Sequence, residues 1–453
     1  MRDATRLFPI RKATLAAALT ALLLAGTAGF LFAGEPASSR SSVERIPELA
    51  RSASSSALQL RAQQLSQLRV DRWQREGYRG QGLKIAILDT GLRGVDSFLG
   101  RVLPAHVQTR SFRADGNLEA KDSQHGILCG EVIHAIAPEA ELLFANWDAD
   151  KPQEFLDAVR WAREQGAQVI SCSVIMPSWS DGDGGGSMHE RLREILGDGK
   201  RLGDVLFFAS AGNTAQRHWS GLFKDAGDGY QAWTAAHSDN VLTPWSASEV
   251  TVELYAHPGS SYEVKVADRD TGEAVAGART HEDRCSAAAR FTPQSGHTYR
   301  VRVRRTGGPG GRFHLVALGG GLEFSTAQGS VAFPADGAEI VAVGAVSSRG
   351  ERLSYSSCGA EGCCRKPDLV APVPFPSIWR SKPFAGTSAA APEAAGLAAV
   401  CWSRHPQWTA NKVRQAMEKS ARDLGPPGYD CETGYGMIRL PDLPANATAK
   451  RSR

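Results

Sequence analysis

The stretch KIAILDTG, residues 84–91, decides the fold of this chain. Ile85 to Leu88 form a continuous apolar run, which is typical of a strand buried on both faces of a parallel sheet. Asp89 follows directly, and functional side chains of α/β proteins gather at the carboxyl ends of such strands. The stretch therefore predicts an α/β domain whose chemistry lies at that edge of the sheet.

Further runs of the same kind extend the prediction to a sheet of several strands. They occupy residues 142–145, 169–170, 205–209 and 340–343. Apolar residues at helical spacing fill 155–164, between two of these runs. Strands that alternate with helices form right-handed βαβ units, so we expect a parallel sheet covered by helices on both faces.

Residues 215–324 have a different pattern and predict an inserted domain. Short runs there alternate apolar with polar residues and are separated by Gly- and Asp-rich turns, which predicts an antiparallel β-sandwich. The runs lie at 250–255, 262–266, 299–303 and 313–317. Trp219, Trp233 and Trp245 are expected in its core, with a binding face for peptide or glycan as the alternative.

The two ends of the chain carry other signals. Arg2, Arg6, Arg11 and Lys12 precede an uncharged run at 13–33, so residues 1–33 are typical of an export signal, either cleaved or kept as a signal-anchor. We expect an exported protein: secreted, periplasmic or anchored to the outer face of a membrane. Residues 34–68 are predicted as a flexible tether or short pro-segment, with a short helix from 57 to 75, and residues 442–453 as a disordered tail.

Composition excludes several classes of protein. The formal net charge is only +4, which argues against a polybasic nucleic-acid binder, and the mean hydropathy of −0.27 argues against a polytopic membrane protein. Eight cysteines in an exported chain permit disulfides, but none has zinc-site spacing. The acidic loop at 181–186 and the pair Asp225 and Asp228 are candidate calcium sites, although solvated loops are the favoured interpretation. No other cofactor is expected.

Three segments combine the residue types of nucleophilic catalysis. Asp89 ends a buried strand, His125 opens an apolar stretch, and Ser388 lies in Gly386-Thr387-Ser388 before a run of small residues. A serine hydroxyl needs an adjacent base, which a histidine supplies while a carboxylate orients it. Asn213 ends another buried strand, where its amide could donate to an oxyanion beside the Ser388 N–H. Each residue alone could be a turn or capping residue, but the ordered set predicts hydrolytic chemistry.

These segments together resemble the subtilisin-like serine proteases, the subtilases. The resemblance covers about 69–214 and 325–441 and rests on the Asp, His and Ser motifs and on Ser210-Ala211-Gly212-Asn213. It implies that Ser388 is the nucleophile, His125 the general base, Asp89 its orienting partner and Asn213 part of the oxyanion hole. It also implies a set of substrate-binding residues, which comprises Ser171, Cys172, Ser173, Ala211 and Gly212.

Some positions depart from the family pattern. Ile127 stands where Thr is usual, Ala389 where Met is usual and Glu393 where His often follows, while Cys129 matches a variant seen in some members. Ile175 stands where Gly is usual beside the first substrate pocket, so we expect that pocket to be reshaped. The triad and Asn213 are unaffected by these departures.

The sequence therefore predicts an exported, monomeric serine endopeptidase that acts on proteins or peptides through an acyl-enzyme. It predicts no nucleic-acid partner, and membrane anchoring only through the N-terminal run. The alternative from another class is a catalytically weak or inactive binding protein of the same fold, in which the inserted sandwich would bind a partner. The segment before the protease domain looks too short and too polar to be a folded foldase prodomain.

Overall fold

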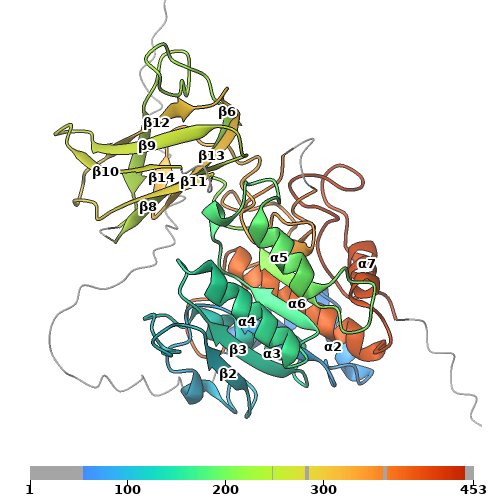
Figure 1. Cartoon of the computed structure of the whole chain (residues 1–453). Helices are drawn as coiled ribbons and strands as arrows, with labels where there is room; N and C mark the ends of the chain where they lie inside the picture. Colours follow the sequence, from blue (N-terminus) through green and yellow to red (C-terminus); the bar gives the residue numbers. More distant parts are fainter. Residues whose placement is uncertain (1–54, 247, 281–284, 361–364, 444–453) are drawn as a thin grey trace, which may run out of the picture. The chain divides into compact units, whose positions relative to one another are not determined.

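The computed structural model describes residues 55–246, 248–280, 285–360 and 365–443 (Figure 1). Its centre is a seven-stranded sheet in which every neighbouring pair is parallel, in the order β16-β15-β5-β4-β1-β3-β2. The strands are β1 Lys84–Leu88, β2 Gln108–Ser111, β3 Glu141–Asn146, β4 Val169–Cys172, β5 Leu206–Ser210, β15 Ile340–Val346 and β16 Leu369–Pro372. The predicted parallel α/β sheet is confirmed.

Helices cover both faces of this sheet, because successive side chains of a strand point to opposite faces. Ile85 and Ile87 of β1 belong to one apolar core, which also contains residues of α3 and α6. Ala86 and Leu88 belong to a second core, formed with α4 and α5. The helices are α1 Ser55–Gln67, α2 Val70–Arg75, α3 His125–Ile136, α4 Pro152–Glu164, α5 Ser187–Leu196, α6 Thr387–Arg404 and α7 Ala410–Ser420, with short 3-10 turns η1 Val95–Phe98 and η2 Pro177–Trp179.

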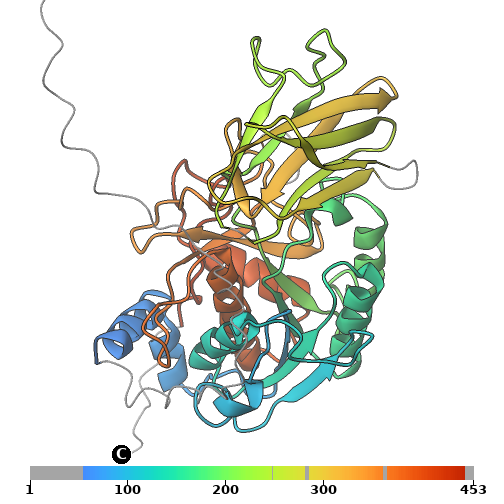
Figure 2. The same cartoon turned by 90° about the vertical axis from the view of Figure 1, so that its left-hand side faces the viewer.

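Nine strands between β5 and β15 form two antiparallel sheets, in the orders β10-β9-β12-β7-β14 and β11-β8-β13-β6 (Figure 2). An apolar core lies between the two sheets. The strands are β6 His218–Leu222, β7 Asn240–Pro244, β8 Val250–Ala256, β9 Ser261–Asp268, β10 Ala274–Arg279, β11 Ser286–Phe291, β12 Tyr299–Gly307, β13 Arg312–Leu318 and β14 Gly320–Leu322. Trp233 is buried and Trp219 packs against the core, but Trp245 is 48% exposed, so its predicted place in the core is wrong.

The chain leaves the parallel sheet and returns to it at one place. The Thr326 amide donates to the His218 carbonyl at 2.7 Å, and the Thr214 hydroxyl donates to the Ser330 carbonyl at 2.8 Å. The outgoing and returning segments therefore run side by side, as insertion of a domain into another requires.

Side-chain contacts also join the insert to loops of the α/β domain. Glu253 of β8 accepts the Ser178 amide at 2.9 Å, and Arg290 of β11 pairs with Asp150. Both of these loops follow strands of the parallel sheet, β4 and β3 respectively. The insert is thus attached beside the carboxyl edge of that sheet.

The helix that the sequence predicts at 57–75 is found as α1 and α2, and α1 lies within the segment predicted as a tether. Residues 55–67 form helix α1, and its Arg61 is buried in an ion pair with Glu131 of α3. The predicted signal at 1–33, the rest of the tether up to residue 54, and the tail from 444 lie outside the described residues. Among the described helices, none combines the length and apolar character that crossing a bilayer requires.

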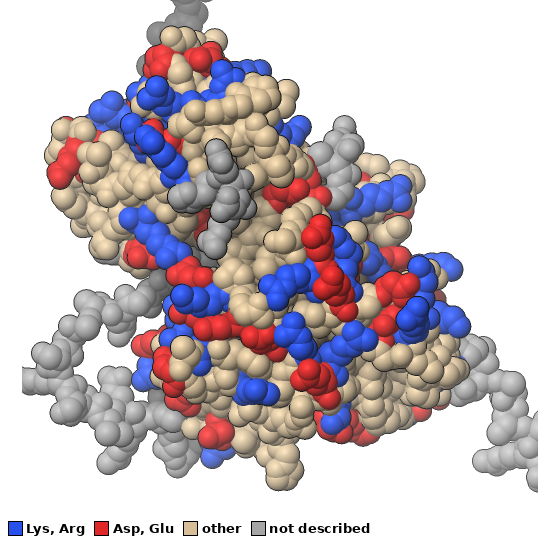
Figure 3. Space-filling model, viewed as in Figure 1, with Lys and Arg blue, Asp and Glu red and all other residues tan. Residues whose placement is uncertain are grey.

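Acidic and basic side chains are interspersed over the molecular face drawn in Figure 3. Such mixing agrees with the small formal net charge of +4. The six cysteines within the described residues form no disulfide with one another, and Cys363 and Cys364 lie outside those residues. Cys129 and Cys172 are buried, as expected for packing thiols.

Candidate active site

Asp89, which is buried, and His125, which is partly exposed, form a pair at the carboxyl edge of the sheet. Asp89 follows β1 and is 1% exposed, while His125 is the first residue of α3. Nδ1 of His125 lies 2.6 Å from Oδ2 of Asp89, and Oδ1 of Asp89 accepts the Gly91 amide at 2.9 Å. Because a carboxylate only accepts, Nδ1 carries the proton and the Nε2 lone pair is left to act as a base.

Gly126 allows this pair to form. A Cβ at Gly126 would lie 2.6 Å from Cδ2 of Leu92 and 2.8 Å from Cβ of Asp89. Both distances are shorter than atoms tolerate, so any larger residue would push α3 away from the end of β1. Steric crowding thus explains why glycine follows the histidine in the sequence motif.

The protonated form of His125 is stabilised at this site. Burial lowers the pKa of the imidazole, but its interactions with Asp89 and with Cys129 together outweigh this effect, and the pKa lies well above its usual value. The ring of Phe384 packs edge-to-face with the imidazole, with the two ring centroids 5.4 Å apart, and covers part of it. A raised pKa makes the neutral imidazole a stronger base and stabilises the imidazolium that forms once it has taken up a proton.

Ser388 is the second residue of α6, where backbone N–H groups have no helical partner. Its carbonyl accepts the Ser173 hydroxyl at 3.0 Å, and Sγ of Cys129 lies 3.7 Å from the same carbonyl. Sγ of Cys129 also lies 3.9 Å from Oδ2 of Asp89. The thiol of Cys129 therefore lies between the Asp89–His125 pair and the start of α6, so the structure brings the three predicted residues together.

Asn213 is held against the same helix start. Its Oδ1 accepts both the amide and the hydroxyl of Thr387, each at 3.0 Å, which leaves the Nδ2 amino group to donate elsewhere. The Thr387 hydroxyl also accepts the Gly212 amide at 3.2 Å. Gly386 has φ +85°, and a Cβ there would lie 3.0 Å from Nδ2 of Asn213. Glycine is thus required beside this amide both for the backbone and for space.

The predicted substrate-binding residues divide into two groups. Ser173 contacts the backbone of Ser388 directly. The side chains of Ser171 and Cys172 in β4 and of Ala211, just after β5, are buried, and Gly212 offers no side chain. A substrate that reached these four residues would therefore contact only their backbone. The sequence does not predict that Phe384 belongs to the site, because a single aromatic residue outside any motif does not indicate a function.

The acidic loop proposed as a calcium site is held by protein groups. Oδ1 of Asp181 accepts the amides of Asp183 and Gly185, and Oδ2 of Asp183 lies 2.7 Å from Nε2 of His257. Asp228 pairs with Arg302 in the second candidate site. These contacts account for both loops without a cation.

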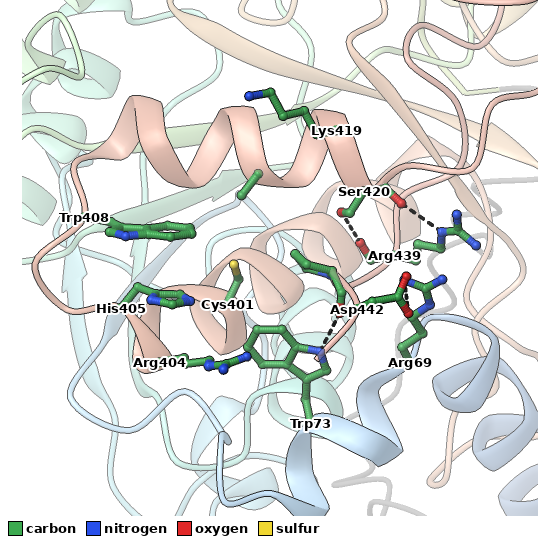
Figure 4. A pocket seen from close by; sticks show the side chains of 12 residues that line it. Arg69, Trp73, Cys401, Arg404, His405, Trp408, Lys419, Ser420, Arg439 and Asp442 are labelled. Carbon is green, nitrogen blue, oxygen red and sulfur yellow. Dashed lines mark hydrogen bonds and ion pairs between the residues drawn. The ribbon is translucent and has the colours of Figure 1, made fainter. Parts of the chain in front are cut away.

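A pocket of about 530 Å³ lies elsewhere, between α2, α6, α7 and the end of the described chain (Figure 4). Its basic residues are largely engaged: Arg69 pairs with Asp442, Arg439 donates to the Ser420 carbonyl, and Arg404 stacks over Trp73. None of its lining residues belongs to the predicted catalytic set. The cluster of Asp89, His125, Ser388 and Asn213 remains the candidate active site.

Comparison with known proteins shows the family of the chain. The model of the subtilase family matches residues 80–278 and 286–436. The chain belongs to the subtilase family. This subtilase is 38% identical over 133 residues both to subtilisin amylosacchariticus of Bacillus subtilis subsp. amylosacchariticus and to a subtilisin of Bacillus pumilus. The matches cover 28% of the chain and 32% and 45% of those proteins, so the chain spans less than half the length of the curated relatives it matches.

Among solved structures, the CspB protease of Clostridium perfringens superimposes with a TM-score of 0.59. The alignment covers 82% of this subtilase and 94% of that chain, at 14% identity. At such low sequence identity, the structural similarity shows a shared fold only. It supports the subtilisin-like architecture found here, with its parallel sheet and flanking helices.

Proposed function

We propose that this subtilase is a serine endopeptidase that hydrolyses peptide bonds in proteins or peptides. The observation that carries the proposal is the 2.6 Å contact between Nδ1 of His125 and Oδ2 of the buried Asp89, next to a helix that begins at Thr387-Ser388. A carboxylate that orients a histidine beside a serine at a helix start is the arrangement that activates a hydroxyl nucleophile.

Each residue has a definite part in the proposed reaction. His125 takes the Ser388 hydroxyl proton as Oγ attacks the scissile carbonyl, and Asp89 stabilises the resulting imidazolium. The Ser388 N–H and Nδ2 of Asn213 donate to the negatively charged oxygen of the tetrahedral intermediate. His125 then gives its proton to the leaving amine, and an acyl-enzyme remains on Ser388. Water, deprotonated by His125, hydrolyses this ester and restores the hydroxyl.

The cellular setting of the proposal is export. Its basis is the uncharged run at 13–33 behind four basic residues. The rival function, a non-catalytic binding protein, does not need the hydrogen-bonded Asp89–His125 pair and is not favoured.

Hydrolysis of casein by the purified protein tests the proposal. Ser388→Ala should lower kcat by about 10⁶, the loss known for a subtilisin that lacks its nucleophile. Ser354→Ala is the matched control, because Ser354 is an exposed serine outside the candidate site. Wild type and control should cleave casein equally. More than a few per cent of wild-type activity in purified Ser388→Ala protein would contradict the proposal.

A further inference from the structure

Arg217 lies directly beside the candidate oxyanion residue. Its amide donates to the Thr214 carbonyl at 2.9 Å, which turns the chain back after β5. Its Nε donates to the Asn213 carbonyl at 3.0 Å. Because the side chain of Asn213 holds Thr387, the guanidinium of Arg217 is linked through a single residue to the start of the nucleophile helix.

Trp245 covers this guanidinium on one side. The Cζ atom of Arg217 lies 4.9 Å from the centroid of the indole ring, at a distance typical of a cation–π contact. Trp245 is held by its amide, which donates to the Gly319 carbonyl at 3.0 Å, yet its side chain is 48% exposed. An indole that shields a cation on one side and faces solvent on the other is typical of a binding surface.

Within the described residues, no carboxylate pairs with Arg217. Burial lowers the pKa of its guanidinium to about 10, and no acidic neighbour raises it again. Several, though not all, of the other arginines of the insert have acidic partners: Arg302 pairs with Asp228 and Asp239, Arg290 with Asp150, and Arg279 with Glu263. A partly buried cation without a counter-charge is costly, and an anion that arrives from outside would offset this cost.

We propose that Arg217 and Trp245 form a subsite for a carboxylate of the substrate, so that the enzyme prefers peptides with an Asp or Glu side chain at one position within a few residues of the scissile bond. The inference rests on the proposed protease function. Its main support is position, since Arg217 touches the residue that would hold the oxyanion. A carboxylate that binds there forms charge-assisted hydrogen bonds with a planar guanidinium.

The subsite gives the insert a part in substrate choice. Arg217 immediately precedes β6, and Trp245 immediately follows β7. These residues come from the two different sheets of the insert, since β6 and β7 belong to separate sheets. The insert therefore supplies the cation and its aromatic cover, while the parallel sheet supplies the catalytic groups.

Matched pairs of peptides test this inference. Each pair differs only by Glu or Gln at one position, from the fourth residue before the scissile bond to the third after it, and kcat/KM is measured for both. A further pair carries either a free C-terminal carboxylate or its amide, which distinguishes a chain end from an acidic side chain. At one position the Glu peptide should be preferred by about 10- to 100-fold, the effect expected of one hydrogen-bonded charge.

Variants then assign the preference to Arg217. Arg217→Gln should bring the Glu/Gln ratio close to one, and Arg217→Lys should keep part of it. Arg305→Gln is the matched control, because Arg305 also stacks on an aromatic ring, Phe223, and donates to a carbonyl, that of Pro309. The control should leave the ratio unchanged. Labelling by a fluorophosphonate shows whether each variant is folded with a reactive site.

The outcomes separate this inference from the proposed function. Equal cleavage of the Glu and Gln peptides by an enzyme that labels would overturn the inference alone, as would a Glu preference that survives in labelled Arg217→Gln protein. Preference confined to the free C-terminal carboxylate would also overturn the side-chain specificity. Failure of the wild type both to label and to cleave any peptide would overturn the protease function, and this inference with it.

Discussion

Asn213 shows how one side chain can serve two purposes in the candidate site. Its carbonyl oxygen is occupied by the amide and hydroxyl of Thr387, so the orientation of the side chain is fixed before a substrate arrives. The amino group on the same side chain is thereby directed away from these bonds. A donor that needs no reorganisation during the reaction is most effective toward charge that develops in the transition state.

Replacing Asn213 with Ala should therefore slow the chemical step and not substrate binding. We expect kcat to fall by about 10²- to 10³-fold with little change in KM, the loss known when an oxyanion donor is removed from a subtilisin. Asn117→Ala, at an exposed position, serves as the control. Steady-state kinetics on a peptide amide give both constants, and an effect confined to KM would show that Asn213 only binds substrate.

Most of the candidate site could be predicted from the sequence, because its residues follow strands or open helices within motifs. Asp89, His125, Asn213 and Ser388 all have such positions, and a parallel sheet brings the ends of its strands to one edge. The contacts around them could not be predicted. Ser173 bonds the Ser388 carbonyl across 215 residues, and Arg217 belongs to no motif.

The sequence predicts a helix at 57–75, but it does not predict the contacts that α1 makes. Arg61 donates to the Pro376 carbonyl and pairs with Glu131, while Glu131 also accepts the Ser377 hydroxyl and the Ile378 amide, both at 2.8 Å. Glu131 lies on the helix that begins with His125. Helix α1 therefore joins the N-terminal segment to the helix that carries the candidate base, which a polar segment of a single sequence does not reveal.

Removal of the Arg61 charge should destabilise the protein strongly, because Glu131 would remain buried without a counter-charge. We expect Arg61→Met to lower the free energy of unfolding by about 3–5 kcal/mol, measured by urea denaturation. Arg72→Met, on an exposed face of α2, is the matched control and should change little. A shortened chain that begins at Leu68 lacks the same charge and should be similarly unstable. A loss below about 1 kcal/mol in Arg61→Met would mean that α1 is dispensable.

The strands show where local sequence is sufficient. Continuous apolar runs form β1, β3 and β5, whereas apolar and polar residues alternate in β8, β9, β12 and β13. The burial of these strands can therefore be predicted from their sequence pattern. β2, with the sequence Gln-Thr-Arg-Ser, has no such pattern because it is an edge strand with mostly exposed side chains. Its place is decided by pairing with β3 and could not be predicted.

A buried pair of histidines lies where the insert begins, at its junction with the rest of the molecule. His218 starts β6 and donates from Nδ1 to the Thr326 carbonyl at 3.0 Å, while His314 of β13 donates from Nδ1 to Nε2 of His218 at 3.0 Å. Both rings are buried. Burial lowers the pKa of His218 to about 4 and that of His314 well below its usual value.

These pKa values predict acid sensitivity of the insert. The unfolded histidine takes up a proton near pH 6.5 but the folded one only near pH 4, so stability that is complete above pH 6.5 is lost as the pH falls toward 4. At pH 4.5, His218 should lower the free energy of unfolding by about 2–3 kcal/mol relative to its value above pH 6.5. Urea unfolding at pH 7.5 and 4.5 measures it. Between pH 7.5 and 4.5, His218→Gln should lose less free energy of unfolding than the wild type, and His237→Gln should lose as much as the wild type. Equal losses of this free energy in all three proteins would contradict this account.

The reactivity of Ser388 is the central claim for the whole protein, and covalent labelling measures it most directly. The purified protein is treated with a fluorophosphonate, and the modified peptide is identified by mass spectrometry. We predict a single adduct on Ser388, at a rate that falls steeply in His125→Ala and with no adduct in Ser388→Ala. An unmodified wild-type protein, or an adduct on another residue while Ser388 stays unmodified, would contradict the account.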